Sequence, residues 1–109
     1  MIAEPQKPVD THDIRAHYAA NLRLGADDIT DSWQRIEDGR GSPTDIAELE
    51  RVCHKLAGSA GVFGYTLVSR YARAAEVALC ELLNDGTRDN VGQMITRLID
   101  AMMAIRIKD

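Results

Sequence analysis

The sequence has no long apolar run, no cluster of basic residues and no sustained alternation of apolar and polar residues. No apolar stretch approaches the roughly 18 residues of a membrane-spanning helix. Residues 1–8 are polar and rich in proline, unlike a secretion signal. Thirteen basic against seventeen acidic residues leave a net charge of −4, which disfavours a nucleic-acid partner. We therefore expect a cytoplasmic protein that binds neither membranes nor nucleic acid.

Several kinds of chemical site are also missing. No glycine-rich loop with a following lysine and serine or threonine is present, so the chain is not expected to phosphorylate itself from ATP. The carboxylates are not spaced to hold Mg²⁺, and the three histidines show no metal-ligand spacing. Cys53 and Cys80 fall on or beside apolar stripes, where free cysteine acts as a small hydrophobic residue. We expect no intrinsic metal or cofactor, and reduced, non-catalytic thiols.

The pattern that is present is helical. At 109 residues the chain is long enough for one core, and we expect a flexible tail over residues 1–10 and one domain over residues 11–109. Apolar residues at three- and four-residue spacing predict a short helix over about 12–22, ended by Gly25. Four longer helices follow, separated by turns at 39–43, 64–65 and 84–90. The predicted fold is all-α, an antiparallel up-down four-helix bundle with a short extra N-terminal helix.

The most informative stretch is residues 54–64, His-Lys-Leu-Ala-Gly-Ser-Ala-Gly-Val-Phe-Gly. His54 lies roughly 130° from the centre of the apolar stripe of its helix, so it is predicted to point away from the core. Gly58 and Gly61 stand four and seven residues later, on the same face as His54. Glycine inside a helix costs roughly 0.8–1 kcal/mol relative to alanine. Either these glycines mark the end of a helix, or they leave the imidazole uncovered for a bulky group.

These eleven residues resemble the signature of histidine phosphotransfer (HPt) domains. The resemblance implies that His54 accepts a phosphoryl group and that Gly58 leaves room for it. It also implies a helical bundle whose partner is the receiver domain of a response regulator, with a hybrid sensor histidine kinase as a further possible partner. In that family the receiver supplies the phosphoaspartate and the Mg²⁺.

Two further features bear on this site. Glu76 follows His54 by 22 residues, the offset at which a glutamine or glutamate of the family orients the imidazole. Glu76 could instead be an exposed residue paired with Arg73. The lysine that the family usually carries three residues after the histidine is here Ala57. Lys55, Arg51 and Arg73 are the other candidate sources of positive charge at the site.

Three functions are compatible with the pattern. The first is a phosphorelay carrier that shuttles a phosphoryl group between aspartates of receiver domains. The second is a docking module that binds a receiver or kinase without carrying phosphate, and Ala57 is its best support. The third is a hydrolytic or metal enzyme, opposed by the lack of a second catalytic group near His54 other than Glu76. We expect a monomer, since each apolar stripe has a place inside one bundle, although Ile105 and Ile107 leave a weak case for a dimer.

Overall fold

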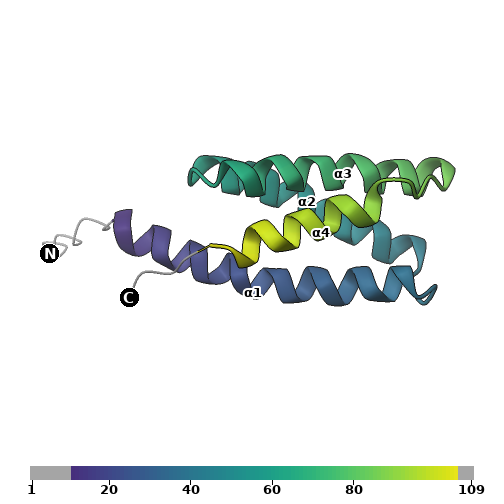
Figure 1. Ribbon diagram of the computed structural model, residues 1–109, viewed down its shortest axis with the longest axis horizontal. Coiled ribbons are helices and arrows are strands. Elements are labelled where there is room, and N and C mark those ends of the chain that lie inside the picture. Colours follow the sequence, from purple (N-terminus) through teal and green to yellow (C-terminus); the bar gives the residue numbers. More distant parts are fainter. Residues whose placement is uncertain (1–10, 106–109) are drawn as a thin grey trace, which may run out of the picture.

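The computed structural model describes residues 11–105, and these residues form four helices with no strand among them (Figure 1). The helices are α1 (Thr11–Glu37), α2 (Pro43–Val62), α3 (Thr66–Asp85) and α4 (Val91–Met103). The chain reverses direction at each short connection, as the colour order in Figure 1 shows. The prediction of an all-helical fold with four long helices is confirmed. The predicted tail over residues 1–10 and the last four residues of the domain lie outside the described range.

The prediction of a separate short N-terminal helix is wrong, because α1 runs unbroken through Gly25 for 27 residues. Its buried positions recur every three or four residues on both sides of that glycine. A Cβ at Gly25 would lie 3.5 Å from Cε of Met102 on α4, an ordinary packing distance. The contacts of the continuous apolar stripe therefore outweigh the cost of about 1 kcal/mol that glycine imposes on a helix.

Local sequence sets where α2 begins and where α3 ends. The Ser42 hydroxyl accepts a hydrogen bond from the Asp45 backbone N–H at 3.2 Å. In return, the Asp45 carboxylate accepts one from the Ser42 N–H at 2.8 Å. This is a reciprocal capping box, with Pro43 in the first turn. Gly86, which follows the last residue of α3, adopts φ +76°, the left-handed conformation that ends this helix.

The core is one cluster of buried residues to which all four helices contribute. The interface between α2 and α3 is the most extensive, and that between α1 and α2 is the smallest. Many of the buried side chains of these two helices are small, and the following are at most 3 % exposed: Cys53, Ala57, Ala60, Ala72 and Ala75. They allow the two helices to approach closely. No helix within residues 11–105 is both long enough and apolar enough to cross a membrane.

Candidate functional site

The site is built around His54, which lies in the middle of α2. Its side chain is 73 % exposed, in agreement with its helical phase, while the preceding residue, Cys53, is fully buried. An exposed imidazole on a rigid helix leaves a ring nitrogen open to a reacting group.

Glu76 on α3 holds the other side of this ring. Its carboxylate Oε2 lies 2.6 Å from Nδ1 of His54, and the Glu76 side chain is only 22 % exposed. A carboxylate accepts a hydrogen bond from an Nδ1–H, so this contact favours the neutral tautomer with its proton on Nδ1. The lone pair of the ring is then on Nε2, the nitrogen that does not contact Glu76. The structure shows Glu76 paired with His54 and forming no ion pair with Arg73 among the described side chains.

The two glycines of the motif have different surroundings. A Cβ built on Gly58 would meet no atom within 4 Å, so the space beside His54 on this face of α2 is open. A Cβ on Gly61 would lie 3.3 Å from Oγ of Ser69 on α3, which is tighter than ordinary packing. Gly58 therefore borders open space, whereas Gly61 permits the close approach of a neighbouring helix.

Ala57, at the usual lysine position of the motif, is buried in the interface between α2 and α3 and is 3 % exposed. Its backbone carbonyl accepts a hydrogen bond from the Ser69 hydroxyl at 2.7 Å. Sequence reasoning missed Ser69. The available signal was its position seven residues before Glu76, on the same face of α3.

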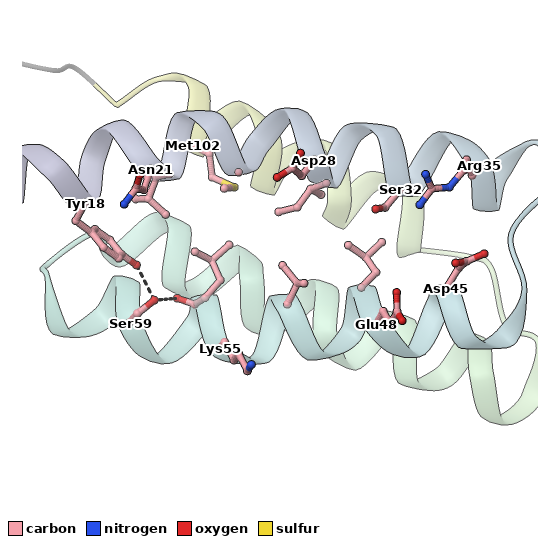
Figure 2. Close-up of a pocket in the computed structure, with 16 residues that line it drawn as sticks. Tyr18, Asn21, Asp28, Ser32, Arg35, Asp45, Glu48, Lys55, Ser59 and Met102 are labelled. Atoms are coloured by element: carbon pink, nitrogen blue, oxygen red, sulfur yellow. Dashed lines mark hydrogen bonds between the residues drawn. The ribbon is translucent and has the colours of Figure 1, made fainter.

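The candidate cations Arg51, Lys55 and Arg73 are all exposed. Among the described side chains, the contacts between a basic group and a carboxylate are Arg40–Asp38 and His54–Glu76, so none of these three cations is held by a carboxylate there. Lys55 lies along the groove between α1 and α2 (Figure 2). The structure thus brings together His54 and Glu76, and it pairs none of the three cations with a described carboxylate.

That groove was not predicted from the sequence. It has a volume of about 410 Å³ and an apolar floor, and polar side chains of α1 and α2 point toward one another across it (Figure 2). The hydroxyls of Tyr18 and Ser59 hydrogen-bond at 2.7 Å at one end. Burial raises the pKa of Tyr18, an effect that the Ser59 hydrogen bond partly opposes. The groove follows from the small α1–α2 interface, which helical periodicity alone does not reveal.

Cys53, the residue before His54, is not available as a second nucleophile. Burial raises the pKa of the Cys53 thiol to about 12, with smaller contributions from the carboxylates of Glu76 and Glu50. Cys53 is therefore a thiol, with negligible thiolate, at neutral pH. Among residues 11–105, no three His, Cys, Asp or Glu side chains are grouped so as to hold a metal ion.

Comparison with known protein families identifies a family to which the chain is similar. The family model of the Hpt domain matches residues 22–107, a range that includes most of α1 and the whole of α2, α3 and α4. Both His54 and Glu76 lie inside it. Neither the search of curated proteins nor the search of solved structures found a match.

Proposed function

The chain belongs to the Hpt domain family, which serves histidine phosphotransfer in phosphorelays, and on this premise we propose that His54 is its phosphoryl acceptor. In this proposal the protein takes a phosphoryl group from a receiver-domain phosphoaspartate, or from a kinase, and passes it to the aspartate of another receiver. The observation that carries the proposal is the exposed His54 ring, whose Nδ1 lies 2.6 Å from the Glu76 carboxylate.

The contact with Glu76 explains how His54 would act as a nucleophile. With Nδ1–H donated to Glu76, the Nε2 lone pair attacks the phosphorus of the aspartyl phosphate. The N–P bond forms as the bond from phosphorus to the aspartate oxygen breaks, and the aspartate leaves as a carboxylate. No proton has to leave the attacking nitrogen. The ring becomes cationic on phosphorylation, and the Glu76 carboxylate stabilises that charge. Transfer to the second receiver is the reverse of these steps.

The space beside Gly58 is where the incoming group would be accommodated, since no protein atom lies there. Phosphoryl transfer also requires neutralisation of the charge on the phosphoryl oxygens. We propose that the receiver supplies Mg²⁺ for this purpose. Arg51, Lys55 and Arg73 have no partners among the described carboxylates, so they are free to turn toward the oxygens or toward the receiver. Gly61 would contribute to the site indirectly, because it permits the close approach of α3, the helix that carries Glu76.

Hpt domains interact with receiver domains and kinases in phosphorelays. For this chain we propose that a receiver docks over His54 and that a hybrid sensor kinase is an upstream donor. We also propose an antiparallel up-down bundle that acts as a cytoplasmic monomer. The short connections at residues 38–42, 63–65 and 86–90 support that topology, because they leave no room for a crossover along the bundle.

The decisive experiment is intact-protein mass spectrometry after incubation with a phosphorylated receiver domain and Mg²⁺. We expect an acid-labile phosphoryl adduct on the wild-type protein and none on His54→Gln. Because His54 is exposed, the variant should fold normally, with a stability change within about 0.5 kcal/mol. Binding to several receivers without any adduct would overturn the carrier proposal in favour of a docking module. An adduct that persists in His54→Gln would show that another residue is the acceptor.

A further inference from the structure

Two pairs of residues meet across the interface of α2 and α3, and they share the same spacing. His54 meets Glu76 through a 2.6 Å contact, and Gly61 faces Ser69, whose Oγ would lie 3.3 Å from a Cβ on the glycine. Gly61 follows His54 by seven residues, and Ser69 precedes Glu76 by seven. Seven residues are about two helical turns, so both pairs lie along the same line of contact between the helices.

The Ser69 hydroxyl makes a hydrogen bond that crosses this interface. It donates to the backbone carbonyl of Ala57 at 2.7 Å, and Ser69 is partly buried. Among the described side chains, this bond and the His54–Glu76 contact are the two side-chain hydrogen bonds that join α2 to α3. Because Ser69 lies opposite a glycine, its hydroxyl reaches the backbone of α2 without obstruction.

The buried side chains around the two hydrogen bonds are small and apolar. They are Cys53 and Ala57 on α2 and Ala72 and Ala75 on α3, and their apolar contacts have no preferred direction. A displacement of one residue along a helix axis is about 1.5 Å. A shift of that size would change both the length and the direction of the 2.6 Å contact of His54 with Glu76. A directional bond to a fixed carbonyl opposes such a shift, whereas apolar contacts are non-directional.

We propose that Ser69 is a positioning residue, which sets the register of α3 against α2 and thereby holds the Glu76 carboxylate on Nδ1 of His54. Gly61 is the small residue that makes this bond possible. The expected effect of Ser69 on the rate of phosphotransfer rests on the proposed function of His54. Its expected effect on the imidazole tautomer does not, so the positioning role of Ser69 and the acceptor role of His54 are tested separately.

The test combines Ser69→Ala with nitrogen-15 NMR of the His54 ring at alkaline pH, where imidazole is neutral and its two nitrogens report the tautomer. We expect the population protonated on Nδ1 to fall to about half or less of its wild-type value, and phosphotransfer to slow roughly tenfold. The matched control is Thr30→Ala, which removes a hydroxyl that donates to the Ala26 carbonyl at 2.8 Å within α1. Thr30→Ala should leave tautomer and transfer rate unchanged.

A second pair of variants covers the case in which Ser69→Ala fails to fold. Gly61→Ala places a methyl group against the Ser69 hydroxyl, whereas Gly58→Ala makes the same chemical change on the same helix in open space. The tautomer should change in Gly61→Ala and stay as in the wild type in Gly58→Ala.

A wild-type tautomer in a folded Ser69→Ala or in Gly61→Ala would overturn the positioning role, whatever the transfer rate. A changed tautomer in a protein that accepts no phosphoryl group would support the positioning role and refute the proposed function alone.

Discussion

At the scale of single residues, the chemistry of the site depends on one hydrogen bond. His54 is exposed on one side and contacts Glu76 on the other, so the carboxylate decides which ring nitrogen carries the proton. Glu76 is shielded by its position beside the α2–α3 interface, which strengthens its interaction with the ring relative to a fully solvated pair. The neighbouring Cys53 thiol, with its raised pKa, takes no part.

We predict that Glu76→Ala lowers the rate of phosphoryl transfer to His54 by roughly 10- to 100-fold, by analogy with the loss of the hydrogen-bond partner of a metal-bound histidine. Glu76→Gln should lose less, because the amide oxygen still accepts a hydrogen bond from Nδ1–H. Quenched-flow measurement with a phosphorylated receiver gives these rates. The matched control is Glu81→Ala, which removes an exposed carboxylate further along α3. Equal rates for Glu76→Ala and wild type would show that the contact is not used in transfer.

At the scale of the elements, identical glycines have opposite roles. Gly25 lies inside α1, with room for a methyl group, whereas Gly86 has φ +76° and ends α3. A side chain at Gly25 would favour the helix, but one at Gly86 would be strained in the left-handed conformation. The effect of adding one methyl group at each position therefore reports the local backbone conformation.

We predict that Gly25→Ala raises the free energy of unfolding by up to about 1 kcal/mol, and that Gly86→Ala lowers it by about 1–2 kcal/mol. Urea denaturation followed by circular dichroism measures both values. A destabilised Gly25→Ala would indicate that α1 is interrupted at this position and would restore the two-helix interpretation of residues 11–37.

At the scale of the whole molecule, packing is uneven around the bundle. The interface of α2 with α3 is extensive and closely packed, and it holds the pair His54–Glu76. The interface of α1 with α2 is small and leaves a groove (Figure 2). The site therefore lies at the most firmly packed interface of the bundle, where a fixed distance between side chains on two helices is easiest to maintain.

Burial of Cys53 predicts how the stability of the molecule depends on pH. Its thiol has a pKa of about 12 in the folded chain against an ordinary value of 9.0, so above pH 9 the unfolded chain releases a proton that the folded chain retains. The contribution of the protonated Cys53 thiol to the free energy of unfolding is complete below about pH 9 and is lost as the pH rises toward 12. For one proton, the free energy of unfolding falls by at most about 1.4 kcal/mol per pH unit.

Urea denaturation at a series of pH values between 8 and 11 measures this slope. In Cys53→Ala the free energy of unfolding should fall less steeply with rising pH. The variant should nevertheless be less stable than the wild type over this range, because its core is underpacked. The raised pKa of Tyr18 acts in the same direction and leaves a residual slope. Equal slopes for the two proteins would show that Cys53 titrates normally in the folded state.

Much of the architecture was predictable because helices are specified locally. The three- and four-residue spacing of apolar side chains identified the four long helices, and the turns predicted at 39–43 and 84–90 lie where α2 begins and where α3 ends. The break at Gly25 was predicted wrongly, since the propensity of one glycine is smaller than the packing energy of a long continuous stripe.

By itself, the sequence determined that the protein is an all-helical domain with His54 on a solvent-facing surface beside two glycines, since these properties follow from helical periodicity within single segments. Only the tertiary structure decided which residues of different helices meet. It placed Ser69 against Gly61, left Gly58 open and formed a groove between α1 and α2. Register and spacing between helices depend on side chains distant in sequence, and no periodicity within one helix encodes them.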